Sequence, residues 1–151
     1  DFAGYSLFAI GFSYIFGIKT PENFNMPFIS RNIRDFWGRW HMTLSFWFRD
    51  FVYMRSVSFW TRSKKVKSIS LISAISYITS FGLMGLWHGF NLHYIIYGLY
   101  HALLFIIYEY AAKKFKHKSL TKSLLLNKIL SITLTTQCVC FGLFIFSGRL
   151  F

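Results

Sequence analysis

The feature that most constrains this chain is a series of long apolar runs separated by short basic stretches. Such runs approach the roughly 20 residues that a helix needs to cross the hydrocarbon core of a bilayer. Hydrophobic residues make up 54% of the sequence and charged residues 15%, whereas soluble domains carry about a quarter charged residues. A water-soluble fold would leave too much apolar surface exposed. The sequence therefore predicts an all-α, polytopic bundle of transmembrane helices in the cell membrane.

Four runs have the composition of membrane spans. They cover residues 2–18, 69–87, 92–112 and 124–146. Between the first two, Thr20 before Pro21 and Glu22 is a typical helix start, and Ser30 is a candidate cap for the helix that follows. We therefore expect short helices in the connection as well.

The charge pattern predicts how these spans cross the membrane. Residues 19–67 and 113–122 are rich in Lys and Arg, whereas the turn at 88–91 carries no formal charge. Cytoplasmic loops carry the excess of basic residues, so the two basic stretches are expected inside and the turn outside. Topology and anionic lipid then explain the net charge of +12. Nucleic acid, which the same charge would suggest in a soluble protein, is not an expected partner.

Residues 33–59, which include "FWGRWHMTLSFWFRDF", mix aromatic and charged residues. Asp35 and Arg39 have the spacing of an ion pair on a helix. Aromatic residues fall on nearly every side, which favours a helix that is buried or re-entrant over one that lies on the membrane surface. If the segment is helical throughout, one face carries Trp37, His41, Leu44, Ser45, Phe48 and Val52.

Two histidines, His41 and His88, each directly follow a tryptophan. A hydrogen-bonded core histidine is the simplest interpretation of either one. However, ionisable side chains at membrane depth are costly, which indicates a functional role. A neutral imidazole can act as general base on a hydroxyl, as in acyl transfer from a thioester or ester. Gly89 would let another backbone or a substrate come close to the His88 ring.

Another polar stripe lies on the run 92–112, where His93, Tyr97, His101 and Glu109 share one helical face. A metal site is one interpretation, but the two histidines are eight residues apart and no third ligand accompanies them. Packing and hydrogen bonding across the bundle is the favoured interpretation, and no metal is expected.

The motifs "RDFWGRWHMTLSFWFRDFVYMR" and "LMGLWHGF" resemble those of the membrane-bound O-acyltransferase (MBOAT) family. Within the family, "DFAGYSLFAIG", "GIKTPENFN" and "YGLYHALL" are similar to the subgroup that transfers D-alanine to teichoic acids in Gram-positive bacteria. The resemblance runs along nearly the whole chain. It implies that residues 1–151 are a single C-terminal catalytic portion of a larger helix bundle.

The resemblance also implies roles for individual residues. His88 would be the catalytic general base on the incoming hydroxyl, and His41 would orient or polarise a reacting group. Both would line a narrow tunnel, which is how an aromatic segment could hold charge and imidazole. The residues expected to line or support this tunnel are Trp37, Arg39, Trp40, Ser45, Asp50, Trp87 and Gly89.

The implied acyl donor is D-alanine, held as a thioester on the phosphopantetheine of a small acidic carrier protein, with no cofactor bound directly to this chain. The implied acceptor is a hydroxyl of (lipo)teichoic acid. Membrane lipid and other membrane proteins of the D-alanylation pathway would be further partners. A polysaccharide O-acetyltransferase of the same family, a transporter or channel with relay histidines, and a non-catalytic scaffold remain alternatives.

The predicted topology places the two histidines at different levels. His88 lies near the outer end of its span, whereas His41 belongs to a stretch expected in the cytoplasm. The two rings can meet only if the segment 33–59 dips into the membrane, or if the helix at 69–87 starts deeper than its hydropathy suggests.

Overall fold

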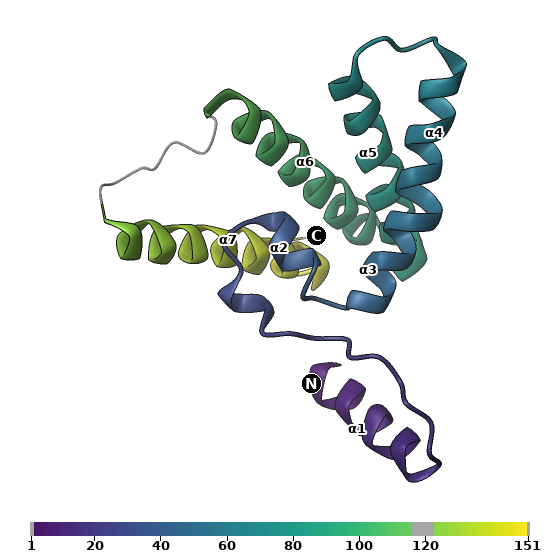
Figure 1. Cartoon of the computed structure of the whole chain (residues 1–151), viewed down its shortest axis with the longest axis vertical. Helices are drawn as coiled ribbons and strands as arrows, with labels where there is room; N and C mark the ends of the chain where they lie inside the picture. The colour runs from purple at the N-terminus through teal and green to yellow at the C-terminus, as the bar shows by residue number, and fades with distance from the viewer. Residues whose placement is uncertain (1, 116–122, 151) are drawn as a thin grey trace.

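The computed structural model describes residues 2–115 and 123–150, and within them all regular structure is helical (Figure 1). The predicted all-α class is therefore confirmed. Three helices are long and apolar enough to cross a membrane, namely α5 (Ile69–His88), α6 (Leu92–Phe115) and α7 (Leu124–Phe146). The basic connector expected at 113–122 contributes its first three residues, Lys113, Lys114 and Phe115, to the end of α6. Its remaining residues, 116–122, lie outside the described part of the chain.

The first apolar run forms a shorter helix than expected, α1 (Phe2–Ile15), and the chain then turns at Gly17 with φ of 71°. Residues 18–26 contain no helix, so the helix start expected at Thr20 was wrong. A single 3₁₀ turn, η1 (Pro27–Ile29), leads to α2 (Ile33–Trp37). The cap of α2 is Asn32, whose Oδ1 accepts a hydrogen bond from the Asp35 amide at 2.9 Å. The prediction that Ser30 caps this helix was therefore wrong.

The segment 33–59 is not one helix, so the single helical face expected there was also wrong. Helix α2 ends at Trp37, and the chain turns before α3 (Met42–Phe48) begins. From there α3, a π-helical segment η2 (Arg49–Tyr53) and α4 (Met54–Ser63) follow one another directly. Residues 42–63 thus form one helix roughly 33 Å long, about the thickness of a hydrocarbon core.

The break has a tertiary cause. His41 adopts the left-handed conformation, with φ of 43° and ψ of 54°, which interrupts the helical hydrogen bonds. A separate strip of chain supplies replacements: the Asn25 amide donates to the Arg39 carbonyl, and the Met42 amide donates to the Asn23 carbonyl, both at 2.9 Å. Hydrophobic periodicity carries no information about such partners, so it favoured a continuous helix.

The helix 42–63 runs beside α5 in the opposite direction (Figure 1). Its hydroxyl groups contact those of α5: Ser76 Oγ donates to Ser56 Oγ at 3.0 Å, and the Tyr53 and Ser73 hydroxyls lie 2.9 Å apart. The helix 42–63 therefore runs from the end of the bundle where α5 finishes with His88 to the opposite end, where the basic loop at 64–68 lies. His41, directly before α3, is thereby brought to the same end of the bundle as His88.

Helices α5 and α6 form a tight antiparallel hairpin whose close approach depends on glycine. A Cβ atom on Gly85 would overlap the Tyr94 carbonyl, and one on Gly98 would overlap the Phe81 carbonyl. Helix α7 packs on the other side of α6, where Gly142 lies against the His101 ring. The buried core gathers around this hairpin and α2, so the bundle holds α2 directly against α6.

Candidate active site

His88 is the last residue of α5, and aromatic side chains surround its ring. Its ring centroid is 4.8 Å from that of Trp87 and 4.9 Å from that of Phe146, and Tyr94 and Tyr97 lie at 6.0 and 6.3 Å. Among residues 2–115 and 123–150, no hydrogen bond to either ring nitrogen is recorded. The ring is half-buried. An imidazole held by ring packing alone keeps its nitrogens available to a substrate.

Gly89 ends α5 with φ of 150°, a conformation that L side chains rarely adopt. A Cβ atom at this position would lie 3.0 Å from the Tyr94 ring. The glycine therefore allows the chain to turn directly after His88 while Tyr94 remains packed near the imidazole. The group next to Gly89 is thus the Tyr94 side chain of the neighbouring helix, and the expectation that Gly89 admits another backbone or a substrate to the His88 ring stays a prediction.

His41 is held by Asn23. The His41 Nδ1 and Asn23 Oδ1 atoms are 3.3 Å apart, and the same Oδ1 accepts from the Thr43 hydroxyl at 2.7 Å and from the Thr43 amide at 3.3 Å. These donors identify the Asn23 atom as the amide oxygen. Nδ1 must then carry the proton in the neutral ring, which leaves the lone pair on Nε2.

The two histidines influence each other electrostatically. Burial lowers the pKa of His41, and a positive charge on His88 would lower it further. His41 therefore stays neutral over more of the physiological range than an ordinary histidine. A left-handed, non-glycine residue is strained, and such strain concentrates at functional sites. The geometry and the protonation state both suit a polar group that meets a substrate.

The expected supporting residues divide into two groups. Trp37 is buried and its Nε1 donates to His101 Nδ1 at 3.2 Å. Trp40 stacks on Phe36 at 5.6 Å, and Ser45 Oγ donates to the Trp40 carbonyl at 2.9 Å. These residues hold the turn that carries His41.

Arg39 belongs to the same group, because its Nε lies 2.7 Å from Asp35 Oδ1 and its guanidinium also contacts the Asn25 carbonyl. The ion pair expected from the spacing is confirmed. Asp50, in contrast, pairs with its neighbour Arg49 at 2.7 Å on an exposed surface. Trp87 is 59% exposed within the described structure, and its ring packs edge-on against that of His88.

A cavity of about 390 Å³ lies between α2, the helix 42–63, α5 and α6. Trp37 and Ser45 line it, as do Met84, Tyr77, Arg34 and Glu109. Ser45 follows His41 by one helical turn, and Met84 precedes His88 by one turn. The cavity therefore extends from Glu109 to Ser45 and Met84, and neither His41 nor His88 is among its lining residues. That Trp37 and Ser45 line a tunnel for substrate stays a prediction.

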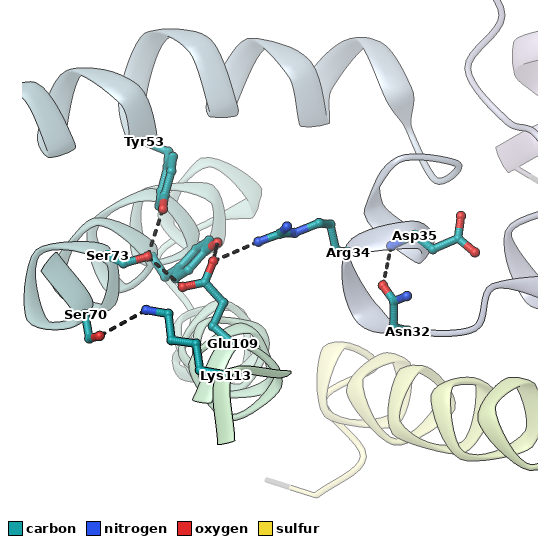
Figure 2. Close-up of polar contacts among 9 residues, drawn as sticks. Asn32, Arg34, Asp35, Tyr53, Ser70, Ser73, Glu109 and Lys113 are labelled. Carbon is teal, nitrogen blue, oxygen red and sulfur yellow. Dashed lines mark hydrogen bonds and ion pairs between the residues drawn. The ribbon is translucent and has the colours of Figure 1, made fainter. Parts of the chain in front are cut away.

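The far end of the cavity holds a network centred on Glu109 (Figure 2). Its carboxylate accepts hydrogen bonds from Arg34 at 2.8 Å, Tyr77 at 2.7 Å and Ser73 at 2.9 Å. Tyr53 extends the network through Ser73. Hydrogen bonding across the bundle, expected for the stripe on α6, is confirmed for His101 and Glu109. Their partners come from α2 and α5, so α6 alone could not reveal them.

Comparison with known proteins assigns the chain to a class. The sequence model of MBOAT, the membrane-bound O-acyltransferase family, matches residues 1–146. The chain therefore belongs to this family of multi-pass membrane proteins, and the predicted resemblance is confirmed.

Individual relatives narrow the similarity. The chain is 55% identical over its whole length to the teichoic acid D-alanyltransferase of Bacillus subtilis (strain 168). It is 45% identical, over 99% of its length, to the enzyme of the same name from Streptococcus thermophilus. The probable alginate O-acetylase of Pseudomonas syringae pv. tomato is 42% identical over 68% of the chain. The chain spans 38% of each D-alanyltransferase and 18% of the acetylase.

Proposed function

We propose that the protein is an O-acyltransferase that moves D-alanine from a carrier-protein thioester toward a hydroxyl of (lipo)teichoic acid. The single observation that carries this proposal is the placement of His88 at the end of the α5–α6 hairpin, packed among aromatic rings and with no hydrogen bond to its ring nitrogens from the described residues. Similarity to D-alanyltransferases along the whole chain supports the choice of acyl group.

In the proposed reaction, the acceptor hydroxyl oxygen attacks the thioester carbonyl carbon while a nitrogen of His88 takes the hydroxyl proton. The carbon–sulfur bond then breaks, and the proton passes from His88 to the departing thiolate. The products are an ester and the free thiol of the phosphopantetheine arm. A positioned general base contributes about 10²- to 10⁴-fold to such a step.

His41 orients the acyl donor and does not take the hydroxyl proton, which goes to His88. With Nδ1–H held by Asn23, the Nε2 lone pair can accept a hydrogen bond from an N–H of the D-alanyl amino group. This contact would orient the thioester carbonyl toward the hydroxyl, and orientation of reactants is itself a large source of rate enhancement. Protonation of His41 would remove the lone pair, so its lowered pKa serves this role.

The donor would enter from the end of the bundle that holds Glu109. The basic loop at 64–68 lies at that end, and positive residues mark the cytoplasmic face. A basic face also suits an acidic carrier protein. The phosphopantetheine arm belongs to the carrier, so this chain binds no cofactor of its own, and other pathway proteins would receive or relay the acyl group.

A polysaccharide O-acetyltransferase is the second candidate, favoured by the similarity to the alginate O-acetylase. The chemistry at His88 would be the same, and only the acyl group would differ. The test therefore offers both donors to the complete gene product in proteoliposomes, a D-alanyl carrier thioester and an acetyl thioester. Release of the carrier thiol is measured for the wild type, for His88→Ala and for Cys140→Ser, a substitution of an exposed side chain on α7.

We expect the wild type and Cys140→Ser to consume the D-alanyl thioester and His88→Ala to lose at least about 100-fold in rate. Consumption of the acetyl thioester alone would replace the first candidate with the second. Full activity of His88→Ala would overturn the assignment of the base. Proton flux that depends on His88, without thioester consumption, would identify a channel instead.

A further inference from the structure

The buried histidine of α6, His101, has no part in the proposed chemistry, yet it is 1% exposed and polar. Its Nδ1 accepts a hydrogen bond from Trp37 Nε1 at 3.2 Å. A buried polar group is costly without a partner, whereas an apolar side chain of similar size would carry no such requirement. The bond joins α2 directly to α6.

The ring of His101 lies where four helices meet. Trp37 of α2 stands perpendicular to it at 5.2 Å, Phe81 of α5 stacks on it at 6.2 Å, and Tyr97 of α6 lies at 4.6 Å. A Cβ atom on Gly142 of α7 would lie 2.7 Å from His101 Nε2. With so little room the ring cannot turn or shift, so Nδ1 is a fixed acceptor for the Trp37 indole.

Each partner of this hydrogen bond leads to one of the two site histidines. On one side, Tyr97 contacts both His101 and, at 6.3 Å, the ring of His88. On the other side, Trp37 is the last residue of α2 and precedes His41 by four residues. The turn between them is fixed by the bonds of Arg39 and Trp40 already described. One hydrogen bond therefore connects the supports of both imidazoles.

We propose that the Trp37–His101 hydrogen bond is a positioning contact that sets the turn carrying His41 against the hairpin carrying His88. The proposal rests on the proposed function, because it concerns the rate of the same acyl transfer. His101 is a positioning residue, since it acts through Trp37 and Tyr97 and does not touch the reacting groups. Its loss lowers the rate of the chemical step and leaves binding of the donor unchanged.

Two substitutions of nearly identical shape test this. In His101→Asn the amide oxygen occupies the place of Nδ1, so the acceptor is kept. In His101→Leu a methyl group takes that place, and both variants lose the same outer part of the ring. In the complete gene product we expect kcat of His101→Asn to stay within about threefold of wild type and that of His101→Leu to fall at least about tenfold, because small misplacements of reacting groups are costly.

The KM for the carrier thioester should be the same in both variants, and both are assayed below their melting temperatures. The Trp37→Phe background supplies the matched control: without the indole donor, the difference between His101→Asn and His101→Leu should disappear. A difference that persists there would show that the acceptor acts on something other than Trp37 and would overturn the proposal.

The two proposals fail separately. If the wild type consumes an acyl thioester but His101→Asn and His101→Leu have equal kcat, the positioning contact is wrong and the proposed function stands. A fall in His101→Leu that appears only in KM would also overturn the positioning role. If the wild type consumes neither the D-alanyl nor the acetyl thioester, both proposals are overturned.

Discussion

The two ends of the α5–α6 hairpin differ in how they hold their ionisable residues. At the histidine end, His88 is surrounded by aromatic rings and His41 sits in a strained turn. At the glutamate end, the Glu109 carboxylate accepts three hydrogen bonds from Arg34, Tyr77 and Ser73. A satisfied network stabilises a fold. The ring nitrogens of His88 and the Nε2 of His41, for which the described residues supply no hydrogen bond, are available for chemistry.

The comparison shows that one short helix, α2, is bonded to both parts of α6. Arg34 and Trp37, three residues apart on α2, bind Glu109 and His101, which lie eight residues apart on α6. This separation is roughly 12 Å along the helix axis. The stable end therefore provides the anchor from which the strained turn at His41 extends toward His88.

The largest expected effect is a loss of catalytic rate on substitution at the histidine end. His88→Gln keeps a polar side chain but removes the base, so we expect the rate of thioester consumption to fall about 10²- to 10⁴-fold. The apparent Tm should change little, because the His88 side chain makes no hydrogen bond in the described structure that the substitution could remove. Turnover of the donor and thermal unfolding in detergent are measured on the same sample. A loss of rate matched by a large fall in Tm would assign His88 to the fold instead.

The next largest effect concerns the close contact between α5 and α6, midway between the two ends of the hairpin. Gly98→Ala would place a methyl group on the Phe81 carbonyl, and overpacking of this kind costs about 1–3 kcal/mol. Gly82→Ala is the matched control on the partner helix, because its Cβ would meet nothing within 4 Å. We expect Gly98→Ala to lower the apparent Tm and Gly82→Ala to leave it unchanged or raise it. Equal Tm values would mean that the hairpin is not as close as described.

Glu109→Gln should affect stability more than chemistry. The substitution removes the charge opposite Arg34 and weakens the hydrogen bonds from Tyr77 and Ser73, at a cost of about 1–2 kcal/mol. We expect a lower Tm with kcat reduced much less than in His88→Gln. Urea or thermal unfolding and steady-state kinetics check this. A loss of rate as large as that of His88→Gln, at unchanged Tm, would place Glu109 in the chemistry and remove the contrast between the ends.

The smallest effect is expected at Asp50, which the sequence placed among the tunnel residues. Its ion pair with Arg49 is exposed in the described structure, and exposed pairs contribute little. Asp50→Asn should therefore leave both Tm and kcat close to wild type. A marked fall in kcat would instead support the original expectation that Asp50 lines the passage in the complete protein.

The sequence predicted the parts of the structure that depend on local composition. The runs that form α5, α6 and α7 are apolar over a whole span, and hydropathy detects them directly. Asp35 and Arg39 pair as their spacing indicates. The motifs around His41 and His88 identified the family, because those residue strings are specific even without knowledge of the fold.

The sequence did not predict what depends on contacts between distant segments. The turn at His41 exists because Asn23 and Asn25 supply hydrogen bonds from outside the helix. Arg34 and Glu109 are far apart in the chain, and the polar stripe that includes Glu109 indicates hydrogen bonding across the bundle without identifying Arg34 as the partner. Asn23 followed a proline and a glutamate that suggested a helix, so its role in holding His41 was missed.

The π-helical segment η2, Arg49–Tyr53, has a consequence for the register between the loop at 64–68 and the imidazole of His41. A π turn accommodates one residue more than an α turn, which rotates everything upstream by about 100° around the helix axis. Deleting one residue from η2 would restore a regular α-helix and turn Ser45 and Phe48 away from the cavity that they line. Natural variation in the length of this helix is therefore expected to be strongly constrained, even though η2 itself touches neither histidine.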